Sequence, residues 1–230
     1  GASDVFGFVG TGFTDFNTDG TNKPNDEAMG LYMSDVAFGL ALMQGTTGSD
    51  SYYSLEASAG RVGFQGLGDA IELSASDLEV VVNGSNTDQV VNFSAVTDWD
   101  GVGAATAVNT GLVIGSVTLT ASTEQLQASG TVTMKIDSYV YLKGILTFNK
   151  GPAVDVSLSG SSAKTRMNLM TIGASDVFGF VGTGFTDFKT DGMNKPNDEA
   201  MGLYMSDVAL GLALLRGTTG SDSYYGLQAS

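Results

Sequence analysis

The sequence predicts an all-β protein made of tandem repeats, and three observations predict it. Residues 1–58 and 173–230 are near-identical, because at an offset of 172 they differ at only seven of 58 positions. Apolar and polar residues alternate at period 2 over long stretches, which is typical of half-buried strands. Glycine is abundant, with 32 residues, and proline is scarce, with 3, which argues against long helices and against a proline-rich linker.

The duplicated segment defines the expected domain organisation. Its seven differences are Asn17/Lys189, Thr21/Met193, Phe38/Leu210, Met43/Leu215, Gln44/Arg216, Ser54/Gly226 and Glu56/Gln228. A duplication this long indicates an array. We expect residues 1–172 to form one full β-rich repeat and residues 173–230, a copy of residues 1–58, to start the next. The second copy stops within a strand-like pattern, so we expect about one and a third copies of a 172-residue period, cut from a longer array.

The first long alternating stretch is Ala28 to Gln44, in which the phase slips by one residue at Ser34-Asp35. A one-residue slip would turn the apolar side chains to the other face of a sheet, and a β-bulge at that point would restore them. We therefore predict a bulged strand here, with an amphipathic helix as the alternative. Similar slips occur at Gly60 and at Ser76-Asp77.

The cleanest alternation runs from Leu126 to Phe148, where even positions are mostly apolar and odd positions mostly polar. Helix periodicity does not explain this pattern, which predicts one buried and one wet face. We expect two strands joined by a bend near Asp137-Ser138. Further strands are predicted in Gly1–Gly10, Tyr52–Phe64, Ile71–Val82, Gln89–Val96, Gly111–Ala121 and Val154–Leu158.

A shorter motif recurs inside the long period. An apolar-x-apolar-Ser pattern begins at Leu31, Leu55, Leu73 and Val91, with spacings of 24, 18 and 18 residues. Rungs of this length suit an elongated repeat architecture. Two forms remain open: a β-solenoid, or stacked bulged antiparallel sheets in the manner of a β-sandwich.

Composition restricts the function. Lys and Arg total 10 against 25 Asp and Glu, so the formal net charge of −15 repels nucleic acid. The chain contains neither histidine nor cysteine, the commonest general base and the thiol nucleophile. We expect no enzyme, no catalytic residue and no organic cofactor. The longest apolar run, Val36 to Met43, is shorter than the ~20 residues of a membrane-spanning helix, so no transmembrane segment is expected.

The strongest local motif resembles the start of a calcium-binding loop. Asp15, Asn17 and Asp19 occupy positions 1, 3 and 5, Gly20 follows, and Asp26 falls at position 12. These four oxygen-bearing residues are the predicted Ca²⁺ ligands, and an ordinary polar turn is the alternative. In the second copy Lys189 replaces Asn17, which indicates either a lost ion with the lysine as a tethered counter-charge, or a loop that never bound one.

Aromatic residues in polar surroundings are the candidates for contacts with a surface glycan. Trp99 lies between two aspartates, and Tyr139 and Tyr141 lie at the polar positions beside Lys135 and Lys143. Partial burial of Trp99, and ordinary strand propensity for the two tyrosines, are the alternatives.

Three blocks of sequence resemble giant bacterial extracellular proteins made of long acidic, glycine-rich β-repeats. The blocks are AMGLYMSDVAFGLALM, LEASAGRVGFQGLGDAIELSASDLEVVVN and LQASGTVTMKIDSYVYLKGILTFNK. The resemblance implies a surface adhesin, biofilm-matrix component or filament, located extracellularly or on the bacterial cell surface, whose main partner is itself. We expect a structural or adhesive building block whose repeats stack end to end through sheet edges. The alternatives are a calcium-stiffened adhesin that binds glycan or another surface, and a β-repeat with a hydrophobic groove for lipid.

Overall fold

The computed structural model describes residues 1–18, 22–68, 70–95, 111–189 and 194–230, and the all-β prediction is confirmed for them. The described residues form strands and no helix, so none of them provides a helical membrane span. The strands are β1 (Ala2–Thr11), β2 (Met29–Gln44), β3 (Ser51–Gln65), β4 (Ile71–Ser85), β5 (Leu112–Ile114), β6 (Val117–Leu119), β7 (Gln125–Ile136), β8 (Val140–Lys150), β9 (Val154–Ser157), β10 (Lys164–Thr183), β11 (Met201–Gly217) and β12 (Ser223–Ala229).

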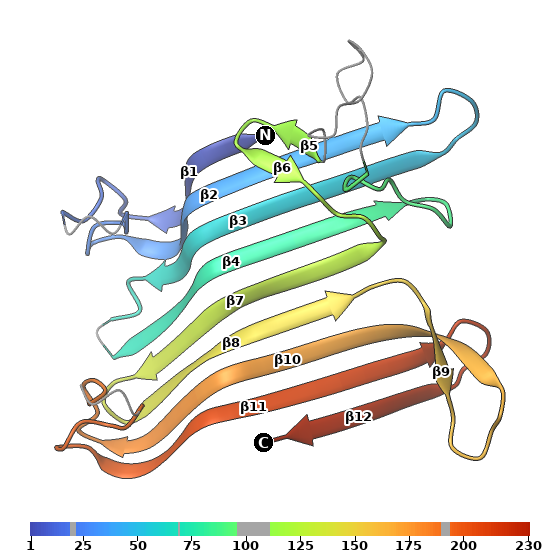
Figure 1. Ribbon diagram of the computed structural model, residues 1–230. Helices are drawn as coiled ribbons and strands as arrows, with labels where there is room; N and C mark the ends of the chain where they lie inside the picture. The colour runs from blue at the N-terminus through green and yellow to red at the C-terminus, as the bar shows by residue number, and fades with distance from the viewer. Residues whose placement is uncertain (19–21, 69, 96–110, 190–193) are drawn as a thin grey trace.

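One large open sheet dominates the molecule (Figure 1). Its strand order is β1-β2-β3-β4-β7-β8-β10-β11-β12, with β9 also paired to β10, while β5 and β6 form a separate hairpin. Every pairing between described strands is antiparallel. Of the two predicted architectures, this pairing corresponds to bulged antiparallel sheets. β1 and β12 are the two edges, so the chain termini lie at opposite ends of the sheet.

Strands β7 and β8 explain how the two faces of the sheet are built. Their register is unbroken from Leu126 to Lys150, with Met134 opposite Leu142. Residues directly opposite each other share a face, so the even positions of both strands lie on one side. That side carries Leu126, Ala128, Val132, Met134, Ile136, Val140, Leu142, Leu146 and Phe148, and we call it the apolar face. The predicted separation into an apolar and a polar face, and the turn after Ile136, are confirmed. The predicted burial of the apolar face is wrong, because Leu126, Ile136 and Leu146 are 39%, 41% and 45% exposed with no second layer packed on them among the described residues.

Five further strands keep their apolar residues on this face by changing phase at a Ser-Asp dipeptide, and β3 changes phase at Gly60, as predicted. In β4, Ala75 lies opposite Val132 and Val80 lies opposite Ala128, so the apolar positions switch from odd to even. The register shifts between Ser76 and Glu79, where Asp77 has a positive φ of 53°. Aspartate tolerates this left-handed conformation better than most residues do. The bulge restores the apolar face.

The same device occurs in four other strands. Asp4, Asp35, Asp176 and Asp207 follow a serine and have φ between 51° and 56°. The predicted bulge at Ser34-Asp35 is therefore confirmed, and the helix alternative is wrong. Across these strands the register places the following residues on the apolar face: Leu31, Met33, Phe38, Leu40, Leu42, Leu55, Ala57, Val62, Phe64, Ile71, Leu73, Val82, Ile172, Val181, Leu203, Met205, Leu210, Leu212 and Leu227.

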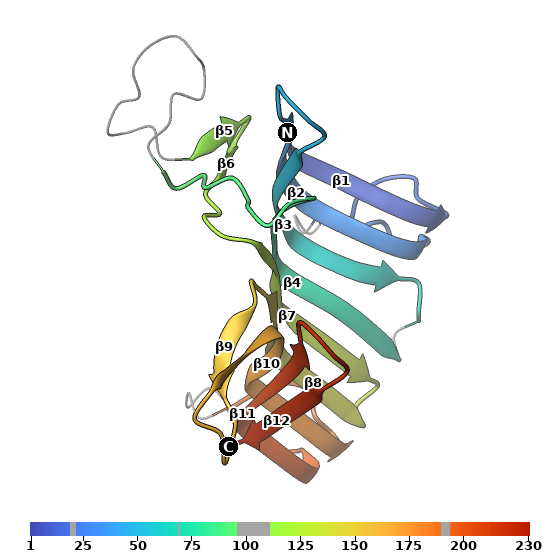
Figure 2. The ribbon, with the colours of Figure 1, turned by 90° about the vertical axis from the view of Figure 1, so that its right-hand side faces the viewer.

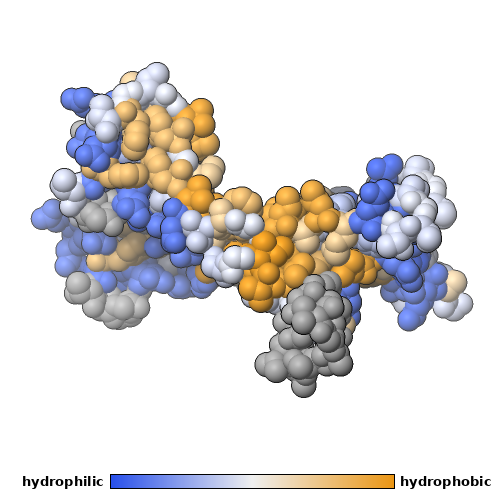
Figure 3. Space-filling view, turned by 90° about the horizontal axis from the view of Figure 1, so that it is seen from above, coloured by the Kyte–Doolittle hydropathy of each residue, from blue (hydrophilic) through white to orange (hydrophobic). Residues whose placement is uncertain are grey.

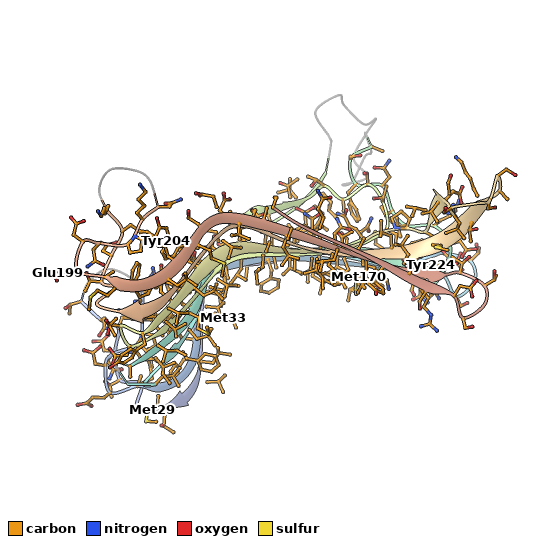
Figure 4. All side chains as sticks on the ribbon, turned by 90° about the horizontal axis from the view of Figure 1, so that it is seen from below. Met29, Met33, Met170, Glu199, Tyr204 and Tyr224 are labelled. Atoms are coloured by element: carbon orange, nitrogen blue, oxygen red, sulfur yellow. The ribbon has the colours of Figure 1, made fainter. Side chains whose placement is uncertain are left out.

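The sheet bends along the line of these bulges (Figures 1 and 4). Met33 and Met170 lie on the same side of the bent sheet, on either side of the line. At the bend, β7 has Gly130 and β8 has Gly144. A Cβ on Gly130 would lie within about 3 Å of Leu78, and a Cβ on Gly144 would lie within about 3 Å of Val177, so a larger residue would clash at either position. We call the part beyond the bulges, which contains Val36–Gln44 and all of β12, the distal arm. The other part is the proximal arm.

The face opposite the apolar one, here called the polar face, is covered in the distal arm by the β5–β6 hairpin (Figure 2). Phe93 and Leu119, both fully buried, pack there against Ala41 of β2. The predicted strand over Gln89–Val96 is wrong, because Gln89–Ala95 form no strand. Instead the Phe93 backbone N–H donates to Ala121 and its carbonyl accepts from Gly111, which places the ring in the cluster.

Candidate functional site

Two loops with nearly the same sequence fold back onto the proximal arm. In the second copy, Phe185 and Phe188 come from the loop after β10, and Phe178 and Phe180 come from β10 itself. The ring centroids of Phe178 and Phe188 are 4.6 Å apart, and Tyr141 of β8 lies 4.8 Å from Phe185. This aromatic cluster fixes the loop against the polar face. Offset by 172, Phe6, Phe8, Phe13 and Phe16 form its counterpart, with Phe6 and Phe16 also 4.6 Å apart.

Asparagine side chains hold each loop in the same conformation. Asn25 Oδ1 accepts from the Thr14 N–H at 3.1 Å, and its Nδ2 donates to the Gly12 carbonyl at 3.2 Å. Asn197 makes the equivalent bonds to Thr186 and Gly184. The Asn22 amide also donates to the carboxylate of Asp35, the bulge residue of β2, at 3.0 Å. The loop is thereby tied to the strand at the bend.

The structure places three of the four predicted calcium ligands, and Asp19 lies outside the described residues. Asp15 Oδ1 accepts from the Phe16 N–H at 2.8 Å, and Asn17 Nδ2 donates to Asp26 Oδ1 at 3.1 Å. Among the described residues, no group of three or more acidic, His or Cys side chains could hold a metal ion. The calcium site stays a prediction.

The second copy of this loop replaces a hydrogen bond with an ion pair. Lys189 Nζ pairs with Asp198 Oδ1, at the positions where the first copy has Asn17 and Asp26. Lys189 thus pairs with a carboxylate of its own loop, and the loss of an ion from this copy stays a prediction. Both versions connect the same two points of the loop, so the substitution preserves its closure.

A polar hollow of about 590 Å³ lies on the polar face of the proximal arm, beside the first loop. Lys23, Arg61 and Lys143 line it together with Asp26 and Glu72. None of these three cations belongs to either ion pair found among the described residues. Three of the ten basic residues therefore gather at one concave surface of a strongly acidic chain.

The structure describes two of the three residues proposed for glycan contact. Trp99 lies outside the described residues, and Tyr139 lies in the turn between β7 and β8. Tyr141 is on the polar face as predicted, but its ring is packed against Phe178, Phe185 and Phe188. Burial, with smaller contributions from the charges of Glu72 and Asp187, raises the pKa of its hydroxyl above the usual value of 10.0. Tyr141 is therefore a packing residue.

The two sheet edges differ from the equivalent positions inside the sheet. β10 contains the counterpart of β1, and there Val181 pairs with Val140 of β8 on one side and with Leu203 of β11 on the other. Val9 occupies the same position in β1 and, among the described strands, pairs only with Leu31 of β2. β1 thus presents an open edge at the place where β10 is paired to β8.

No family model, curated protein or solved structure matches this chain. Sequence reasoning missed the aromatic cluster, although four phenylalanines within an otherwise polar, Gly-rich stretch were an available signal. It recognised two of the Ser-Asp bulges but not the full set of five, which only a comparison of all long strands would have found.

Proposed function

We propose that the protein is a structural building block of an extracellular fibre or cell-surface array, in which successive repeats extend one antiparallel sheet through its edges. The observation that carries this proposal is a contrast between two strands of the same sequence: β10 is paired with β8, whereas the equivalent edge of β1 is open. The same ten residues, Ala2–Thr11 and Ala174–Thr183, have a β8 neighbour in one copy and none in the other. A preceding repeat would supply the missing neighbour in the same register.

This arrangement has a definite geometry. The boundary between residues 172 and 173 falls inside β10, so adjacent repeats would share a strand and need no linker. Six strand-to-strand steps separate β1 from its counterpart in β10. At about 4.8 Å for each step, one period would add about 29 Å to the length of the sheet.

The composition is compatible with an extracellular location. The chain has no cysteine and a net charge of −15, and such a charge keeps exposed repeats soluble and apart. Exposed sheet edges otherwise promote uncontrolled association. Specific pairing between consecutive repeats of one chain would satisfy them.

Electron microscopy of chains with two, four and six tandem copies of residues 1–172 tests the proposal. We expect rods whose length increases by about 29 Å for each added period. Compact particles whose longest dimension does not grow with the number of periods would contradict it. A shuffled order of strands within each period, at unchanged composition, is the control for nonspecific aggregation.

The polar hollow favours a second candidate function, an adhesin that binds an acidic surface glycan. Arg61 and Lys143, which form no ion pair within the described part of the chain, would attract carboxylate or sulfate groups, and charge-assisted hydrogen bonds to such groups are strong. Binding of an acidic polysaccharide, measured by calorimetry, should be lost in the double variant Arg61→Gln, Lys143→Gln. Lys164→Gln, a distant lysine outside the hollow, is the matched control, and equal binding by both variants would exclude this function.

A further inference from the structure

The apolar face is the largest feature of the sheet that the proposed edge-to-edge continuation does not use. It extends over every long strand, and its side chains are exposed to solvent: Leu42 is 75% exposed and Leu146 is 45% exposed. Figure 3 shows hydrophobic residues gathered along the hollow of the bent sheet. The β5–β6 hairpin and the two aromatic loops all lie on the opposite face.

The size of this face indicates an interaction surface. In the distal arm it covers eight strands of the sheet order, from β2 to β12. At about 4.8 Å between strands, and with about eight residues of about 3.3 Å each, the distal arm alone presents roughly 1,000 Å². The largest apolar patch on a typical monomer is about 300–600 Å², and a specific complex buries about 800 Å² on each partner. The distal arm exceeds both values.

We infer that the apolar face of the distal arm packs against the same face of a second copy of this chain, forming a two-layer sheet. A second copy presents an apolar surface of the same width and strand spacing, and aligned sheets pack at about 10 Å with interdigitated side chains. Charged residues reach this face only near the strand ends, at Lys150 of β8, Lys164 and Arg166 of β10 with Asp155 of β9 opposite, and Arg216 of β11. The interior of the interface would therefore contain no unpaired charge.

The alternative occupant is lipid, as in the hydrophobic-groove hypothesis. The net charge of −15 opposes this, since an anionic bilayer surface repels negative charge. The bend also sets the two arms at an angle, so a flat bilayer would contact one arm at a time (Figure 4). The self-association inferred here does not depend on the edge-to-edge proposal, because it uses a face and not an edge.

Sedimentation velocity of the 230-residue chain over the micromolar range tests the inference. We expect a concentration-dependent dimer whose dissociation constant rises at least about tenfold in Leu146→Glu, which buries a charge in the interface. Thr147→Glu, the next residue on the polar face, is the matched control and should leave the dimer unchanged. Circular dichroism checks that both variants keep the strand content of the parent chain.

Cross-linking provides a second measurement that needs no charged substitution. The chain has no cysteine, so Leu126→Cys and Gln127→Cys place a single thiol on the apolar and polar face of β7 respectively. A short bismaleimide should link two chains of the Leu126→Cys variant and leave the Gln127→Cys variant single.

Three outcomes would overturn the inference. The first is a chain that stays monomeric throughout the concentration range. The second is binding to phosphatidylcholine vesicles that Leu146→Glu abolishes, which would assign the face to lipid. The third is association that survives Leu146→Glu but is lost in Val9→Pro, a change at the β1 edge, which would support the edge-to-edge proposal alone.

Discussion

The two copies of the duplicated segment have nearly the same sequence but different surroundings, and their side chains are buried accordingly. Phe185 is 4% exposed in the second copy, whereas its counterpart Phe13 is 38% exposed in the first. The difference arises because β8 supplies Tyr141 beside the second cluster, and β1 has no strand at that side. Comparing the two copies therefore shows how much burial of the aromatic cluster one neighbouring strand provides.

A tyrosine further along the segment shows the reverse difference, because it is buried in the first copy and exposed in the second. Tyr32 is 3% exposed in the first copy and Tyr204 is 43% exposed in the second. β3 continues along β2 as far as Gln65, opposite Gly30, whereas β12 ends at Ala229, opposite Leu210. The two copies together describe the environment that a repeat would have with neighbours on both sides.

The largest expected effect distinguishes the two aromatic clusters. Phe185→Ala should lower the free energy of unfolding by about 3–4 kcal/mol, because it removes a buried ring, and Phe13→Ala should lower it by only about 1 kcal/mol. Urea denaturation followed by circular dichroism measures both. Equal losses would mean that the β8 neighbour does not determine the burial of the second cluster.

The tyrosine pair should show the reverse order. We expect Tyr32→Ala to cost about 3 kcal/mol and Tyr204→Ala about 1 kcal/mol, since only Tyr32 is enclosed by full-length strands on both sides. The same denaturation assay applies. A chain extended to complete the second period should raise the cost at Tyr204 to that at Tyr32, and no change in the extended chain would contradict the explanation.

The bulge aspartates should behave alike in the two copies, because their conformation is local. Asp35 and Asp207 have φ of 55° and 56°, and each accepts a hydrogen bond of 3.0 Å from a loop asparagine. Asp35→Val and Asp207→Val should each cost about 2 kcal/mol, because a β-branched residue is strained in this region. Asp35→Gly is the control, which keeps the backbone conformation. If both valine variants lost much less unfolding free energy than this, the left-handed aspartates would not be what holds the bulges at the bend.

Alkaline pH should affect the second cluster through Tyr141. Burial raises the pKa of Tyr141, so the folded state binds this proton more tightly than the unfolded state does. Its contribution to stability is complete below the ordinary tyrosine pKa near 10 and is lost as the pH rises through the folded value. Unfolding measured between about pH 9 and 12 should show a smaller decline in Tyr141→Phe than in the parent chain. Identical declines would exclude Tyr141 as the source.

The smallest expected effect concerns the loop difference at positions 17 and 189. Asn17→Lys should change the free energy of unfolding by no more than about 0.5 kcal/mol, since it exchanges a surface hydrogen bond for a surface ion pair.

The same variant tests the calcium prediction. A bound Ca²⁺ would raise the melting temperature of the parent chain, and Asn17→Lys would remove the part due to the first copy. A melting temperature that does not respond to calcium or to a chelator would rule the site out.

Much of the fold was predictable because it depends on local patterns. The alternation from Leu126 to Phe148 defined two strands and their faces, and the slip at Ser34-Asp35 predicted a bulge. The strand predicted at Gln89–Val96 failed, because Phe93 contributes its ring to a core built by residues distant in sequence. The candidate site was less predictable, since Lys23, Arg61 and Lys143 come from three separate segments that only the folded sheet brings together.

The sequence by itself determined that the chain is all-β, that its strands carry one apolar side, and that a Ser-Asp dipeptide preserves that side. These properties follow from period-2 alternation and from the conformational tolerance of aspartate, which act over a few residues. Only the tertiary structure decided that the strands form one open antiparallel sheet, and that Phe185 is buried while Phe13 is exposed. Burial depends on which strands lie alongside, and two nearly identical segments cannot encode different neighbours.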